Sequence, residues 1–165
     1  MSAAHKFLVL ISYLTVVSLF LIILMVTYWM VRPYDLFDVT NEPMPIISNE
    51  TTTIDGVEYP VVIAGQMGYF KYERTKNKQL PSRAFETLIN DVTIHLASYE
   101  SNASIGKKCG RKPFRVPNWA DSGIYFLRLT IIYPKVNPVR SIKYEFDTQK
   151  FYVRNEMIQR QAYGL

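Results

Sequence analysis

The sequence is poor in the residues from which catalytic and metal sites are usually built. Its 165 residues include a single cysteine, Cys109, and two histidines, His5 and His95. A lone cysteine cannot form a disulfide within the chain, so the fold depends on its hydrophobic core unless Cys109 pairs between chains. Two histidines and one cysteine cannot supply the usual ligands of a zinc site. We therefore expect neither a metal nor a cofactor.

The few candidates for catalysis are weak. In the alternating segment around Ile94 and Leu96, His95 falls on the opposite face, which is typical of a solvent-facing strand histidine. A Cys109–His95 nucleophile pair is conceivable because the basic residues around Cys109 would lower the pKa of its thiol. The sequence offers no orienting third residue, no oxyanion motif, no paired carboxylates and no phosphate-binding glycine loop. We expect no enzymatic activity and no catalytic residues.

Charge is absent from residues 7–31, which read FLVLISYLTVVSLFLIILMVTYWMV and follow a short leader, residues 1–6. A helix rises about 1.5 Å per residue, so this run can cross a hydrocarbon core of about 30 Å. A cleaved signal peptide is the alternative interpretation. However, signal sequences have a shorter apolar region of about 7–15 residues and end at a small-residue cleavage site. The run predicts an uncleaved transmembrane helix in a lipid bilayer.

The end of this run has the residues of a membrane interface. Tyr28, Trp29 and Tyr34 would form an aromatic belt, and Arg32 could extend to the lipid headgroups. Lys6 and the terminal amine oppose Arg32 alone, which favours a cytoplasmic N-terminus. The C-terminal domain would then lie outside, in a periplasmic or extracellular space.

The charge outside the run is modest. The formal net charge is +5, and removing Lys6 and Arg32 leaves 17 basic against 14 acidic residues, about +3 for the remainder. This excess does not require a nucleic acid, and we expect none as a partner. The length remaining after the helix is that of one ordinary domain.

The chain after the helix has the pattern of a β-domain. Residues 32–53 combine three prolines with polar residues and predict a juxtamembrane connector, with one short strand at Leu36–Val39. Residues 54–153 alternate apolar and polar positions, with a polar turn at Thr75–Lys78. Residues 154–165 form a polar tail. About seven short strands separated by turns predict an antiparallel β-sandwich.

The later strands are the clearest. Expected positions are a strand at 84–89, one at 92–99, one at 124–133, a hairpin connection at 134–138 and a last strand at 140–153. In the last strand the alternation of Ile142, Tyr144 and Phe146 resumes one step out of phase at Phe151. This change of phase predicts a β-bulge near Thr148.

The most specific motif is Asp121-Ser122-Gly123-Ile124-Tyr125-Phe126-Leu127. It resembles the D-x-G-x-Y-x-C segment of immunoglobulin-like (Ig-like) domains, in which the tyrosine forms a corner before strand F. Leu127 stands where those domains have cysteine, so aliphatic packing would replace the inter-sheet disulfide. An ordinary turn entering a strand is the alternative. The resemblance implies an Ig-like sandwich with a tyrosine corner at Asp121, Gly123 and Tyr125.

A second resemblance covers residues 117–153. Their Gly-x-Tyr start, the hairpin sequence Asn137-Pro138-Val139-Arg140 and the Phe-rich last strand resemble small single-pass membrane proteins encoded by bacteriophages. Those proteins mostly have no assigned activity. A likeness of fold does not by itself transfer a function.

The strongest charge feature is a basic segment in a predicted loop, consisting of Lys107, Lys108, Arg111, Lys112 and Arg115. Such a segment could bind an anionic headgroup, an acidic polysaccharide or an acidic protein face. A solvated loop with no ligand is the alternative interpretation.

These observations favour two functions. In the first, a membrane-tethered, non-enzymatic module presents an Ig-like domain to another membrane or envelope protein. In the second, an accessory subunit stabilises a larger membrane complex through its helix. Ser12, Thr15 and Ser18 share one helix face, which could support self-association of the helix to a homo-oligomer. An incidental set of small polar residues is the alternative interpretation.

Overall fold

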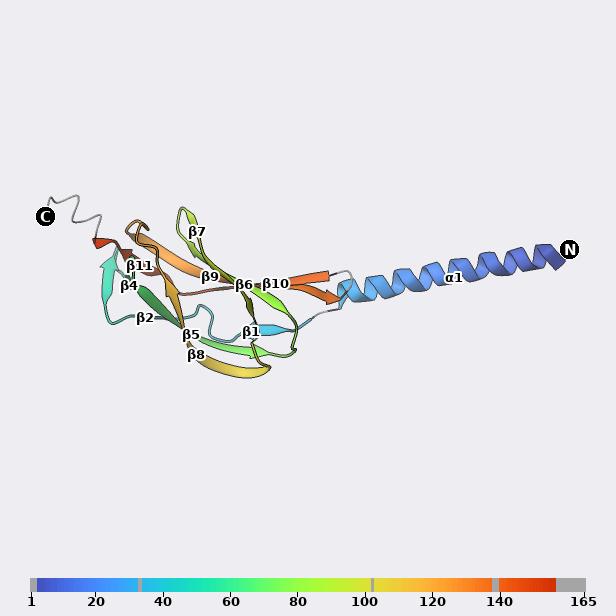
Figure 1. The fold of residues 1–165 in the computed structure, drawn as a ribbon, viewed down its shortest axis with the longest axis horizontal. Coiled ribbons are helices and arrows are strands. Elements are labelled where there is room, and N and C mark those ends of the chain that lie inside the picture. Colours follow the sequence, from blue (N-terminus) through green and yellow to red (C-terminus); the bar gives the residue numbers. More distant parts are fainter. Residues whose placement is uncertain (1–2, 33, 102, 138–139, 157–165) are drawn as a thin grey trace.

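The computed structural model describes residues 3–32, 34–101, 103–137 and 140–156, and Figure 1 shows their arrangement. One N-terminal helix is followed only by strands within these residues. In chain order the elements are α1 (Ala3–Val31), β1 (Phe37–Val39), β2 (Ile46–Ile47), β3 (Thr51–Ile54), β4 (Val57–Ile63), β5 (Met67–Lys76), β6 (Ser82–Ile89), β7 (Thr93–Ser101), β8 (Gly106–Arg115), β9 (Gly123–Asn137), β10 (Arg140–Asp147) and β11 (Phe151–Arg154).

Helix α1 extends straight out from the β-domain (Figure 1). It begins at Ala3, four residues before the apolar run, because alanine is the best helix former and the leader contains no helix breaker. It ends at Val31, two residues before Pro33, where the proline ring disfavours a further helical turn. No part of its most apolar stretch is buried, and by length and composition it is the one described helix able to cross a membrane.

The remainder is a sandwich of two sheets. The four-stranded sheet has the order β1-β5-β2, with β8 also paired to β5; the seven-stranded sheet has the order β3-β4-β11-β9-β6-β7, with β10 also paired to β9. Pairing between the named strands is antiparallel except for β11 beside β4. The predicted class is confirmed: a mainly β protein with an N-terminal helix and an Ig-like antiparallel β-sandwich.

The core lies between the two sheets. Its fully buried side chains come from both of them, and include Leu36, Phe70, Leu88, Leu127, Phe151 and Val153. Leu127, at the position of the missing cysteine, is 0% exposed, so packing alone joins the sheets there.

The described strands outnumber the seven or so that were predicted, and several boundaries change. Seven described strands have seven or more residues, and four shorter ones accompany them. The segment 32–53 carries β1, as expected, and also β2 and β3, so strands of both sheets begin there. The predicted turn at Thr75–Lys78 is wrong in its first half, because β5 continues through Lys76 opposite Gly106.

The predicted bulge near Thr148 is confirmed. Asp147 pairs with Arg128, whereas Phe151 pairs with Tyr125, which is a shift of one residue in register along β9. The Leu127 amide donates to the Thr148 hydroxyl at 2.9 Å, so a buried side chain replaces the missing ladder bond. The predicted hairpin connection at 134–138 is wrong over residues 134–137, because β9 continues through Asn137. The predicted last strand at 140–153 is divided into β10 and β11. Residue 138 of the connection and residues 157–165 of the tail lie outside the described residues.

Candidate functional site

The five basic residues lie in a strand rather than in a loop, which corrects the sequence prediction. Strand β8 pairs with β5 without interruption from Gly106 to Arg115. The segment is rich in glycine, proline and charged residues, which are typical of loops, so the sequence predicted a loop. Its backbone nevertheless forms a continuous antiparallel ladder with β5. Residues directly opposite in an antiparallel pair share a face, so the register separates the five side chains into two groups.

Three of the five point away from the sandwich. Lys107, Arg111 and Arg115 are exposed, and Lys71 of β5 lies directly opposite Arg111. Lys107 forms an ion pair with Glu73, and this contact lowers the pKa of Glu73 and raises that of Lys107. We call Lys71, Arg111 and Arg115 the cationic face, since no ion pair engages them among the described residues.

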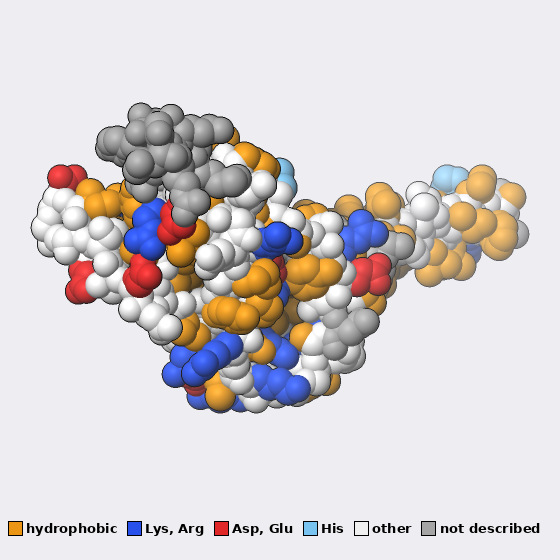
Figure 2. Space-filling model, turned by 60° about the vertical axis from the view of Figure 1, so that its left-hand side comes forward, with side chains coloured by type: hydrophobic (Ala, Val, Ile, Leu, Met, Phe, Trp, Pro, Cys, Tyr) orange, Lys and Arg blue, Asp and Glu red, His pale blue; other side chains and the backbone are white. Residues whose placement is uncertain are grey.

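Figure 2 shows Lys and Arg side chains gathered at the lower edge of the molecule, where β8 lies in Figure 1. Two partly apolar side chains of β5, Met67 and Tyr69, are 49% and 44% exposed on the same side of the sheet. The other edge of β8 has no strand partner among the described residues. A partner can therefore reach the cationic face from the solvent side of the sheet and along the free edge of β8.

The other two residues are placed differently. Lys108 lies opposite Arg74 in the register and is exposed at the rim. Lys112 turns inward and forms an ion pair of 2.6 Å with Glu86 of β6, which is buried. The Tyr99 hydroxyl donates to the same carboxylate at 3.1 Å, and the Lys112 amine lies 4.1 Å from the centre of the Tyr99 ring. Lys112 therefore joins the two sheets and is not a free cation.

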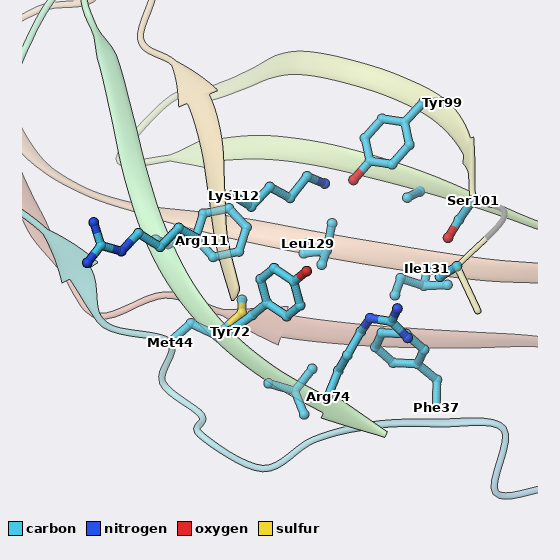
Figure 3. Close-up of a pocket in the computed structure, with 14 residues that line it drawn as sticks. Phe37, Met44, Tyr72, Arg74, Tyr99, Ser101, Arg111, Lys112, Leu129 and Ile131 are labelled. Atoms are coloured by element: carbon cyan, nitrogen blue, oxygen red, sulfur yellow. The ribbon is translucent and has the colours of Figure 1, made fainter. Parts of the chain in front are cut away.

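A cavity of about 330 Å³ opens beside this ion pair (Figure 3). Its lining comes from both sheets: Phe37, Val39, Met44, Phe70, Tyr72, Arg74, Ala84, Tyr99, Ser101, Ala103, Arg111, Lys112, Leu129 and Ile131. Most of these side chains are apolar. The Arg111 side chain extends away from the cavity across β5, whereas the Lys112 amine points towards Tyr99 (Figure 3).

Two cations are buried between the sheets on the inward face of β5. Arg74 is 9% exposed; its guanidinium donates to the Ser104 carbonyl at 3.3 Å and lies 5.7 Å from the Phe37 ring centre. Lys76 is 0% exposed, and its amine has no hydrogen-bond partner among the described residues. Burial lowers the pKa of Lys76, and the charge of Arg74 lowers it further. The amine lies 5.9 Å from the centre of the Tyr133 ring.

The predicted interface residues lie where α1 meets the sandwich. Tyr28 and Trp29 belong to the last turns of α1, and the Arg32 guanidinium lies 5.7 Å from the Tyr28 ring centre. The Tyr34 carbonyl accepts a hydrogen bond of 2.6 Å from the Tyr144 hydroxyl. Strand β10 thus supports the segment that links the helix to the β-domain.

The residues of the predicted tyrosine corner are also brought together. The Tyr125 hydroxyl donates to the Asp121 carbonyl at 3.1 Å, which is the bond that characterises such a corner. Gly123 begins strand β9, and a Cβ at this position would lie 3.0 Å from the Asn90 amide nitrogen. The corner connects the turn to the core, where Tyr125 is 4% exposed.

The weak catalytic candidates are surface residues. His95 is exposed, with its Nδ1 atom 3.4 Å from the Thr87 hydroxyl. Cys109 is exposed on the same side of its sheet as the cationic face, opposite Glu73. No group of three histidine, cysteine, aspartate or glutamate side chains within the described ranges could hold a metal ion.

Sequence reasoning missed the residues buried between the sheets. Arg74, Lys76 and Glu86 were not singled out, although each continues an alternation whose inward positions are apolar. If the alternation that turns Phe70 and Tyr72 inward is continued along β5, Arg74 and Lys76 also fall on the inward face. Arg140 was also missed, because its partners are backbone atoms more than 100 residues away.

Comparison with known proteins identifies no family. No family model matches the chain, and no curated protein matches it. Among solved structures, the chain is similar to the CARDB domain of a Pyrococcus furiosus protein, crystallised in complex with di-metal ions. The two are 11% identical, the match covers 74% of this chain and 97% of that domain, and the TM-score is 0.35. A similarity at this level carries no argument about function.

Proposed function

We propose that this chain is a membrane-tethered, non-enzymatic binding module. Helix α1 crosses the bilayer with its N-terminus in the cytoplasm, and the sandwich lies outside. There the cationic face of β5 and β8 contacts an acidic region of another membrane or envelope protein. A bacteriophage protein acting at the envelope of its host is the specific form of this proposal that the sequence favours.

The exposure of α1 is the observation that carries the proposal. Along the helix, large apolar side chains are exposed, among them Leu8, Tyr13 and Val31 at 65%, 67% and 74%. The sandwich covers none of the helix's most apolar stretch, and the helix points away from it (Figure 1). An apolar surface of this extent requires a non-aqueous environment, and a bilayer provides one for a helix whose backbone is internally hydrogen-bonded.

The cationic face supports the choice of an acidic partner. Lys71, Arg111 and Arg115 lie on one side of two paired strands, and none of them forms an ion pair among the described residues, although Glu73 on the same face attracts Lys71. Unpaired like charges on adjacent strands repel one another, and an acidic surface would remove that repulsion. Arg111 and Arg115 lie on the edge strand β8 and Lys71 on the neighbouring strand β5, and all three are exposed, so a partner can approach without rearranging the sandwich.

Affinity purification from solubilised membranes tests the proposal with three variants. Replacing residues 7–31 by an unrelated transmembrane span should leave partner capture unchanged. The triple substitution Lys71→Gln, Arg111→Gln and Arg115→Gln should reduce capture at least tenfold. The matched control, Arg83→Gln, Lys143→Gln and Lys150→Gln, removes the same charge from exposed positions elsewhere and should not. Loss of capture on exchange of the span would instead support an accessory subunit that acts through its helix.

A further inference from the structure

The cavity between the sheets has the chemistry of a ligand site, and this inference goes beyond the tethering proposed above. We propose that it binds an amphipathic anion that has one alkyl chain, with the chain among the apolar side chains and the charged head at Arg74. Free fatty acids and single-chain anionic lipids share this chemistry.

The walls suit an alkyl chain. Phe37 and Phe70 of the four-stranded sheet, with Met44 of the segment between β1 and β2, line the cavity together with Ala84, Leu129 and Ile131 of the seven-stranded sheet. A volume of about 330 Å³ is at the lower end of the range of small-molecule sites, which is roughly 300–1,000 Å³. This space fits one chain better than the two chains of a bilayer phospholipid.

The charges between the sheets call for an anion. The Arg74 guanidinium lines the cavity while 9% exposed, and the described residues offer it a carbonyl and an aromatic ring but no carboxylate. Lys76 is buried two residues further along the same face. The buried Glu86 is already engaged by Lys112 and Tyr99. A buried cation without a counter-ion is costly, and a carboxylate or phosphate at Arg74 would form charge-assisted hydrogen bonds.

The exposure of the lining residues indicates where the cavity opens. Tyr99 is 36% exposed and Ser101 and Ala103 are half-buried, so we place the mouth at the end of β7, beside the edge strand β8. The Arg74 end lies against β1, since Val39 pairs with Arg74. Phe37 follows Val31, the last residue of α1, by six residues, so this end lies within about 22 Å of chain from the end of α1. A ligand can therefore come from the bilayer or from solution.

Radiolabelled laurate tests the proposal with the full chain in phosphatidylcholine nanodiscs at pH 8, with empty nanodiscs as the partition control. We expect saturable binding of one laurate per chain above the control. Dodecanol, which has the same chain without the charge, should bind at least tenfold more weakly. Lauroyl-lysophosphatidate placed in the disc distinguishes the sources: competition with laurate identifies a bilayer ligand, and lack of competition identifies a soluble fatty acid.

Two variants locate the site. Arg74→Met keeps a side chain similar to the aliphatic stem of arginine but removes the guanidinium, and should weaken laurate binding at least tenfold. Ala103→Trp closes the mouth from a half-buried position and should do the same, which keeps the test decisive if Arg74→Met does not fold. Arg83→Gln removes an exposed cation from the opposite sheet and should bind as the wild type does. Absence of saturable binding, equal binding of dodecanol, or full binding by the Ala103→Trp variant would overturn the proposal.

Discussion

The Arg140 guanidinium donates a hydrogen bond of 2.8 Å to the Met30 carbonyl, and so connects β10 to the last turn of α1. The same nitrogen donates to the Arg32 carbonyl at 3.0 Å. The last carbonyls of a helix have no partner within it, and a basic side chain there satisfies them and opposes the helix dipole. The helix and the sandwich are therefore joined by a specific contact as well as by the chain.

Substituting Arg140 should loosen this junction without unfolding either part. In Arg140→Gln, amide hydrogen exchange at residues 34–36 should be several-fold faster, because the link loses a contact that holds it against β10. Hydrogen-exchange mass spectrometry on the full chain in nanodiscs measures this effect. Lys143→Gln, an exposed change on the same strand, is the control. Equal exchange in the two variants would show that Arg140 does not hold the link.

Removing the buried charge of Lys76 should stabilise the protein. Lys76→Met replaces an amine that has no hydrogen-bond partner among the described residues by an apolar side chain of similar length, and should raise the free energy of unfolding by roughly 1–3 kcal/mol at pH 7. Thermal unfolding of the full chain measures the change. Lys150→Met, at an exposed position, should have little effect. A lower Tm for Lys76→Met would mean that the amine has a stabilising partner.

The same lysine predicts how stability depends on pH. The pKa of Lys76 is lowered in the folded chain, so above this value the unfolded chain binds more protons than the folded chain does. Stability should therefore rise with pH from the lowered pKa towards 10.5, and Lys76→Met should abolish the rise. The Tm measurements should stop near pH 10. Burial raises the pKa of Tyr133, so above the ordinary pKa of tyrosine the folded chain binds more protons than the unfolded chain, and stability falls with pH. A flat profile in the wild type would contradict the shift.

The ion pair between Lys112 and Glu86 predicts a non-additive pair of substitutions. Lys112→Met leaves a buried carboxylate without its cation and should lower the free energy of unfolding by about 3 kcal/mol. Lys112→Met combined with Glu86→Leu should recover most of that loss, since two apolar side chains replace both charges. A double-mutant cycle of unfolding free energies tests this, and additive losses would show that the two residues act independently.

The tyrosine corner predicts a smaller effect. Tyr125→Phe removes the hydrogen bond to Asp121 but keeps the buried ring, and should cost about 1 kcal/mol. Tyr69→Phe, on the exposed side of β5, should cost much less. Equal Tm values for the two variants would show that the corner bond does not stabilise the fold.

Much of the fold could be predicted from local patterns. The apolar run predicted the last residue of the helix correctly, because a long uninterrupted apolar stretch strongly favours a helix and the following proline ends it. The change of phase before Phe151 gave the bulge at Thr148, because side chains in a strand alternate with a period of two. The Gly-x-Tyr segment placed Tyr125 at the start of β9.

The candidate sites were less predictable, since they depend on pairing between distant segments. The basic residues from Lys107 to Arg115 have no apolar alternation, and β8 is recognisable only from its ladder with β5. Lys76 resembles a turn residue in sequence, yet strand pairing carries it into the core. The Arg140 side chain contacts the backbone carbonyl of Met30. Every residue has such a carbonyl, so no residue type in the sequence indicates this partner.

The position of Cys109 allows the most direct test of the proposed topology. This residue is the only cysteine, and it is exposed beside the cationic face. Intact cells that express the full chain are treated with a membrane-impermeant maleimide, before and after permeabilisation, and the membranes are then extracted with alkaline carbonate. We predict full labelling of Cys109 before permeabilisation, on a chain that keeps α1 and stays in the membrane fraction. Labelling only after permeabilisation, or release of a chain cleaved after α1, would contradict a tethered module outside the membrane.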